Sequence, residues 1–418
     1  MRPRPACPRT ESESRRRIFA SRLVTLSLAA LLTSTTVSLA AAPPAQPVEG
    51  PGGMGDRAAT VTKRGLGTTS ASTYAFYKSG PAPAEGRPVA IFLHGWGAVN
   101  PQAYGAWIDH LARQGFLVLF PRFQEVNRSR PSDATDKAEA LVKAALAELA
   151  ADPDAKPDLS KVAAIGHLAG APIAANLAAG AKAKGLPPVR LVFAIMPGGI
   201  ASNPKARGVA LADLAAVPAE TTMIALIGDK DARAADLAAR RILREAAAVP
   251  SERKLLVRAL SDDHGFPALT ATLAAPAGVN PAFDGGAIKI PPEPKDAPKP
   301  PPFKWSAEMA LTGEQQTLVA QINNARTDTL DYLAFWKTFD LAAASAFSGA
   351  DATGLKSNPR FSDMERWADG WPVKRLAVET PRAAPPAPPA ATAAVPANPS
   401  PAKATPAAAR RPAAPKHP

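Results

Sequence analysis

The chain alternates short apolar runs with longer segments in which apolar residues recur at helical spacing. Val89–Leu93 and Phe116–Phe120 are continuous apolar runs, the pattern of strands buried on both faces. Ala106–Gln114 and Asp133–Ala151 have the length and spacing of helices. Further strands are predicted at Tyr74–Tyr77, Val162–Ile165, Val189–Ile195, Thr222–Ile227 and Lys254–Leu260, and further helices at Ala171–Ala179, Ala232–Ala247 and Leu330–Phe347. This alternation predicts an α/β fold: a mainly parallel central sheet with helices on both faces and a C-terminal helical extension.

The first 42 residues have the features of an export signal. Arg15–Arg17 is basic, Leu23–Leu32 is largely apolar, and Ser38–Ala40 offers small residues for cleavage. Arg16 and Arg17 also partly fit a twin-arginine signal, so both the Sec and the twin-arginine route stay open. We therefore predict that the protein is exported, either to a periplasm or out of the cell.

Composition divides the remainder of the chain. Residues 43–70 are predicted to be a linker and residues 71–380 an α/β domain, within which 275–320 is a Pro-rich loop and a candidate cap. Residues 381–418 are mostly Pro and Ala, too poor in large apolar side chains to form a core, and predict a disordered tail. The tail is either a plain spacer or a segment that contacts the cell wall.

Charge and cysteine content narrow the function. The formal net charge is +13, but residues 1–25 carry +5 and residues 383–418 carry +4, which leaves only +4 for the domain. That balance does not indicate nucleic-acid binding. Cys7 lies inside the signal, so the mature chain has no cysteine for a disulfide or a thiolate. The apolar run of the signal is short and interrupted by polar residues, so no membrane association is expected after cleavage.

A glycine-flanked turn, Gly166-His167-Leu168-Ala169-Gly170, follows the predicted strand Val162–Ile165 and precedes a predicted helix. Strand, sharp turn and helix are the context of a G-x-S-x-G nucleophile elbow, in which glycines relieve crowding around a strained central residue. Here the central residue is Leu168, which has no hydroxyl. No Ser, Thr or Cys lies within two residues of it.

Polar residues follow three other predicted strands. His94-Gly95-Trp96-Gly97 comes directly after Val89–Leu93. Asp231, with Asp229 as its competitor, follows Thr222–Ile227, and His264 follows Lys254–Leu260. The order elbow, acid, histidine is the order of a hydrolase triad on an α/β sheet.

These motifs resemble those of the α/β-hydrolase superfamily, in particular dienelactone-hydrolase-like and cutinase-like serine esterases. The resemblance covers about residues 70–270. It implies that the N–H groups of Trp96 and Ala169 form an oxyanion hole, that Asp231 or Asp229 is the acid, and that His264 is the base. It places the nucleophile at Leu168, where the serine is missing.

Three hypotheses about function follow. The first is a catalytically impaired hydrolase homologue that binds a small or ester-like ligand. The second is an active carboxylic ester hydrolase that uses a non-standard nucleophile or a water activated by His264. The third is a structural or binding protein of the cell envelope. The sequence has no metal-ligand spacing or phosphate-binding loop, so no metal or cofactor is expected.

Overall fold

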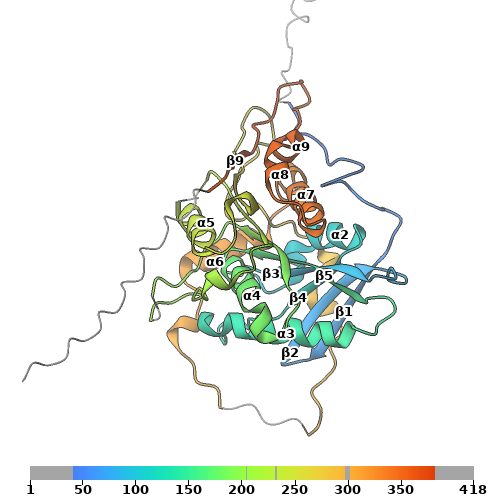
Figure 1. Ribbon diagram of the computed structural model, residues 1–418, viewed down its shortest axis with the longest axis vertical. Coiled ribbons are helices and arrows are strands. Elements are labelled where there is room, and N and C mark those ends of the chain that lie inside the picture. Colours follow the sequence, from blue (N-terminus) through green and yellow to red (C-terminus); the bar gives the residue numbers. More distant parts are fainter. Residues whose placement is uncertain (1–40, 204, 231–232, 297–301, 382–418) are drawn as a thin grey trace, which may run out of the picture. The chain divides into compact units, whose positions relative to one another are not determined.

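The computed structural model describes residues 41–203, 205–230, 233–296 and 302–381. A nine-stranded sheet runs through them in the order β1-β2-β4-β3-β5-β6-β7-β8-β9 (Figure 1). The strands are β1 (Val61–Thr68), β2 (Ala71–Lys78), β3 (Arg87–Leu93), β4 (Leu117–Pro121), β5 (Pro157–His167), β6 (Val189–Ile195), β7 (Thr222–Ile227), β8 (Lys254–Arg258) and β9 (Ala377–Glu379).

The strands from β4 to β8 along this order are parallel, and β1, β2 and β9 make antiparallel pairs at the two edges. The predicted, mainly parallel sheet is confirmed. Its inner strands are buried along almost their whole length, which explains why they read as continuous apolar runs.

Helices cover both faces of the sheet. The principal ones are α2 (Gly105–Arg113), α3 (Ala134–Leu149), α4 (Gly170–Lys184), α5 (Arg233–Glu245), α6 (Gly313–Asn323) and α7 (Lys337–Phe347). The crossover through α2 runs along the sheet in one direction, whereas those through α4 and α5 run in the other. Because such crossovers are right-handed, α2 lies on one face and α4 and α5 on the opposite face. A π-helical stretch, Leu330–Trp336, leads into α7, so the predicted helical extension is present.

An aromatic cluster joins α2 and α7 to the sheet. Trp107 lies edge-on to Phe92, Phe193 and Phe339 at ring-centroid distances of 5.6, 6.4 and 6.3 Å. All four side chains are fully buried. Edge-to-face aromatic pairs at these distances add to the stabilisation from burial alone. Trp107 is therefore part of the core.

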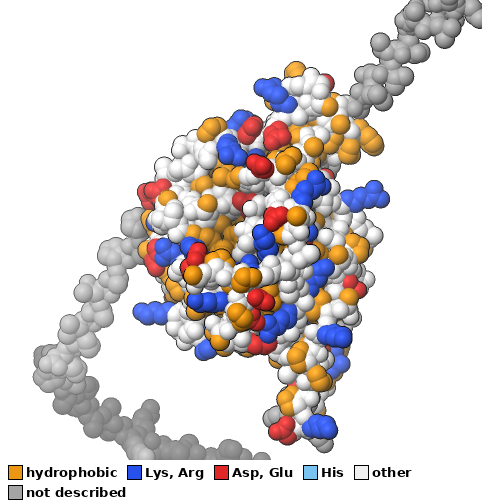
Figure 2. All heavy atoms as spheres, turned by 90° about the vertical axis from the view of Figure 1, so that its right-hand side faces the viewer, with side chains coloured by type: hydrophobic (Ala, Val, Ile, Leu, Met, Phe, Trp, Pro, Cys, Tyr) orange, Lys and Arg blue, Asp and Glu red, His pale blue; other side chains and the backbone are white. Residues whose placement is uncertain are grey.

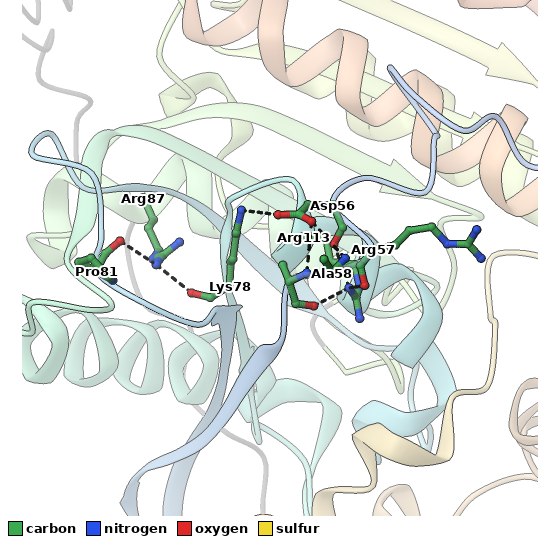
Figure 3. Close-up of polar contacts among 8 residues, drawn as sticks. Asp56, Arg57, Ala58, Lys78, Pro81, Arg87 and Arg113 are labelled. Atoms are coloured by element: carbon green, nitrogen blue, oxygen red, sulfur yellow. Dashed lines mark hydrogen bonds and ion pairs between the residues drawn. The ribbon is translucent and has the colours of Figure 1, made fainter.

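The segment predicted to be a linker is held against the fold. Val61–Thr68 forms β1, which the sequence did not reveal because the strand is only half-buried and shows no continuous apolar run. Arg113 on α2 donates hydrogen bonds to the carbonyl oxygens of Asp56, Arg57 and Ala59, and Lys78 on β2 pairs with the Asp56 carboxylate (Figure 3).

A buried histidine makes a second anchor for the same segment. Both ring nitrogens of His110 face acceptors at 2.9 Å, the Gly53 carbonyl and the Asp340 carboxylate. The segment before β1 is thus tied to α2 and to α7.

On the face drawn in Figure 2, basic and acidic side chains are interspersed rather than gathered by sign. None of the helices in the described ranges is long and apolar enough to cross a membrane. The signal predicted at 1–42 lies outside the described residues apart from its last two. The predicted tail also lies outside them after Pro381.

Candidate functional site

The turn between β5 and α4 has the strained backbone of an elbow. Leu168 adopts a positive φ of 52°, which L-residues other than glycine rarely take. The Leu168 N–H donates to the Ile195 carbonyl at 3.0 Å, and the Leu168 carbonyl accepts from the Gly198 N–H at 3.2 Å. Hydrogen bonds to the end of β6 therefore hold the leucine in this conformation.

The two flanking glycines leave room for this turn. A Cβ on Gly166 would lie 2.2 Å from the Gly170 carbonyl oxygen, and a Cβ on Gly170 would lie 1.9 Å from that of Leu93. Both clashes are with backbone atoms, which cannot rotate away. The glycine spacing seen in the sequence thus has the steric cause that an elbow requires.

The loop after β3 is fixed from behind by His94. Its ring stacks on Phe123 at 4.1 Å and on Phe120 at 5.2 Å, and its Nδ1–H donates to the Gly95 carbonyl at 2.9 Å. Burial lowers the pKa of His94 to about 4, so the ring is neutral near pH 7. His94 therefore packs in the core beneath the loop and is buried among aromatic side chains.

The two predicted oxyanion donors have no partner within the described ranges. The Gly97 N–H is used by Gln124 Oε1 at 2.8 Å, and the Gly95 N–H by the Tyr104 hydroxyl at 3.1 Å. No described residue accepts a hydrogen bond from the backbone N–H of Trp96 or Ala169. Both residues line one cavity together with Leu168.

A buried chain of hydrogen bonds links the oxyanion loop, the elbow and the loop after β8. His167 Nε2 faces the Leu273 carbonyl at 2.8 Å, an acceptor only, so this nitrogen carries the proton. Burial lowers the pKa of His167 to about 4, so the ring is neutral and Nδ1 accepts from the Tyr104 hydroxyl at 2.8 Å. Tyr104 in turn accepts from the Gly95 N–H. Nothing in the sequence indicated that Tyr104 and Leu273 take part in this chain of hydrogen bonds.

The predicted acid cannot be compared directly with the geometry, because Asp231 lies outside the described residues. Its competitor Asp229 accepts a hydrogen bond from the Ser261 hydroxyl at 2.5 Å. The Ser261 oxygen also accepts from the Ala271 N–H at 3.0 Å. Asp229 therefore stabilises the loop after β8 through Ser261. No described histidine makes a hydrogen bond or ion pair with it.

The structure does not bring His264 to the elbow. His264 Nε2 contacts the Asp369 carboxylate at 2.7 Å, and the ring stacks on Trp371 with centroids 5.4 Å apart. Asp262 holds this arrangement, because its carboxylate accepts from the backbone N–H groups of His264 and Lys374. The sequence could not show this, since Asp369 and Trp371 lie about a hundred residues away. His264 is not among the residues that line the cavity at Leu168.

That cavity has a volume of about 340 Å³. Its walls are mostly apolar, formed by Trp96, Leu168, Val209, Leu273 and Leu318. Helix α6 covers it: Thr312, Gln315 and Leu318 line the cavity, and a Cβ on Gly97 would lie 2.6 Å from Val319. The candidate cap 275–320 thus overlaps the start of α6. Across the described part of the chain, no group of three or more His, Cys, Asp or Glu side chains is placed to hold a metal ion.

One known protein family matches the part of the chain that carries the oxyanion loop and the elbow. Residues 69–201 match the chlorophyllase family model, a range that contains the oxyanion loop and the elbow but ends before Asp229 and His264. No curated protein sequence matches the chain.

Solved structures of esterases resemble it. The esterase of the archaeon Pyrobaculum calidifontis is 18% identical, with 48% of this chain and 74% of that chain covered and a TM-score of 0.37. Carboxyl esterase 2 of Tuber melanosporum is 15% identical, with 57% and 87% covered and a TM-score of 0.37. Esterases of Rhizomucor miehei are represented by a chain 17% identical, with 54% and 79% covered and a TM-score of 0.38. Strand order and elbow conformation thus give the chain the α/β-hydrolase fold, and over residues 69–201 it is similar to the chlorophyllase family.

Proposed function

We propose that this chain is an exported hydrolase homologue that binds a small ester-like ligand in the elbow cavity and has lost serine-type catalysis. The observation that carries the proposal is Leu168, which occupies the nucleophile position at a φ of 52° and offers no atom for attack. Export is part of the proposal on the strength of residues 1–42.

The surroundings of Leu168 support loss of catalysis. Thr312 carries the single hydroxyl among the described lining residues, and it accepts a hydrogen bond from the Gln315 N–H in a capping box. Those residues include no histidine, and His264 is bound to Asp369 instead. An attacking oxygen and a base to deprotonate it are both required for this chemistry.

Hydrolysis by an unusual route is the second candidate. The N–H groups of Trp96 and Ala169, which have no acceptor among the described residues, favour it, because they are the groups that would stabilise an oxyanion. In this version a water or a hydroxyl from elsewhere replaces the serine. A role in the cell envelope through the Pro/Ala tail is the third and weaker proposal, and it does not need the cavity.

The test is the rate of p-nitrophenyl butyrate hydrolysis by the purified chain, Leu168→Ser, and the control Leu237→Ser. Leu237 lies on α5 and is 62% exposed, so the control introduces the same residue away from the cavity. We expect no saturable turnover from any of the three, because the described residues that line the cavity include no histidine to activate a serine at 168. Saturable turnover by the natural chain that disappears in His264→Ala would establish the second candidate and overturn the proposal.

A further inference from the structure

The elbow cavity has features that select among ligands. We infer that it takes an alkyl carboxylate, an apolar chain that ends in a negatively charged carboxylate, in preference to the neutral ester of the same chain. This inference rests on the proposed function, since it concerns the ligand of the same site. It is carried by the hydrogen-bond donors at the floor, the charge of the lining and the shape of the walls.

Two residues that line the cavity, Trp96 and Ala169, carry backbone N–H groups for which the described residues supply no acceptor. They are only 6% and 5% exposed. A buried donor left without a partner is costly, and a charged oxygen makes the stronger hydrogen bond to it.

Ala169 is also the N-cap of α4, a helix of 15 residues. No side chain caps this helix, and its first turn contains no acidic residue. The partial positive charge at the helix N-terminus is therefore open to a ligand anion at the cavity floor.

The charged side chain that lines the cavity is positive, like the partial charge at the N-terminus of α4. Arg207 is the one charged side chain among the described lining residues, which include no Asp, Glu or His. It donates to the Ala310 carbonyl and to Gln315 Oε1, and it makes no ion pair with any described residue. A carboxylate entering the cavity thus meets a cation at its lining and no described anion.

Leucine at position 168 suits a bound carboxylate. A serine hydroxyl at this position would be a nucleophile toward an ester carbonyl. The Leu168 side chain is not, and it adds apolar surface to the cavity.

The walls accommodate the chain of such a ligand. Val209, Leu273 and Leu318 line the cavity from the loop after β6, the loop after β8 and α6. A volume of about 340 Å³ falls within the range of small-molecule sites. Each methylene buried there should tighten binding about fourfold, from about 0.8 kcal/mol per CH₂.

The experiment is isothermal titration calorimetry of the full chain with octanoate and with methyl octanoate, followed by hexanoate and decanoate. We expect octanoate to bind about tenfold more tightly than its methyl ester, because a charged acceptor strengthens hydrogen bonds by about this factor. Affinity should also rise from hexanoate to decanoate.

Three variants sharpen the test. Arg207→Gln should weaken octanoate binding about threefold, the scale of an exposed charge, and leave methyl octanoate unchanged. Lys205→Gln removes the same charge from the same loop without touching the cavity, so it should change neither affinity. Leu318→Trp fills the cavity from α6 and should abolish binding of both ligands while circular dichroism stays native.

The outcomes separate the two proposals. Methyl octanoate binding as tightly as octanoate would overturn the carboxylate inference and leave a ligand-binding hydrolase homologue. Binding of octanoate that persists unchanged in Leu318→Trp would also overturn it, since the ligand would then lie elsewhere. Absence of binding by every ligand would overturn both, and saturable hydrolysis of methyl octanoate would overturn the proposed function.

Discussion

The site has two halves, and they differ in how fully they keep the geometry of a hydrolase. In the half that lies within residues 69–201, the elbow has its positive φ, its glycines lie against backbone atoms, and the two residues predicted to carry the oxyanion donors line a cavity. In the half after residue 201, the Asp229 carboxylate accepts a hydrogen bond from the Ser261 hydroxyl, and His264 contacts the Asp369 carboxylate. The elbow is thus backbone architecture that forms around a leucine, whereas the predicted base and the competitor for the predicted acid lie on loops where their side chains have other partners.

A change in the elbow backbone should have the largest effect on stability. Gly170→Ala would put a Cβ 1.9 Å from the Leu93 carbonyl oxygen, so we expect a loss of about 4 kcal/mol or more in the free energy of unfolding, or no folded protein. Urea unfolding measures this. Gly354→Ala in α8 (Thr353–Ser357) is the control: its Cβ would meet open space, and the change should stay within about 1 kcal/mol. A Gly170→Ala protein of unchanged stability would contradict the steric account.

Acid should weaken the first half through its buried histidines. Burial lowers the pKa of His94 and of His167 to about 4, below the usual 6.5. Between these values the unfolded chain binds more protons than the folded chain. The stability that depends on the neutral histidines is therefore complete above about pH 6.5, and the free energy of unfolding falls as the pH drops toward 4. Each histidine contributes on the order of 3 kcal/mol to this loss.

Unfolding in urea at pH 7, 6, 5 and 4.5 measures the loss, and His167→Gln isolates one histidine from the carboxylates that also titrate. Glutamine can keep a donor toward the Leu273 carbonyl but does not titrate. The dependence on pH should therefore be shallower in His167→Gln than in the natural chain. An equal slope in both proteins would mean that His167 is not buried in its neutral form.

Substitutions in the second half of the site should change stability and ligand affinity least. The His264 and Asp369 side chains are 30% and 48% exposed, so their pair is screened by solvent. His264→Ala should lower the free energy of unfolding by less than about 1 kcal/mol and leave octanoate binding unchanged. Parallel unfolding and calorimetric titrations of the natural chain and the variant check both points. A large loss of ligand affinity would place His264 at the cavity after all.

The sequence was sufficient where the physical signal is local. Continuous apolar runs identified the inner strands because parallel strands are buried on both faces. The glycine spacing around Leu168 predicted the elbow because the turn has the same steric requirement whatever its central residue. The same signal predicts a linker where the structure has β1, because an edge strand that is only half-buried has no continuous apolar run.

The sequence by itself determined the α/β architecture, the elbow and the missing hydroxyl. Only the tertiary structure decided where the side chains of the loops point. The partners of His264, the chain of hydrogen bonds from Tyr104 through His167 to Leu273, and the cover that α6 forms over the cavity join residues far apart in the chain. Secondary structure follows from neighbouring residues, but a loop side chain chooses among all partners that folding brings within reach.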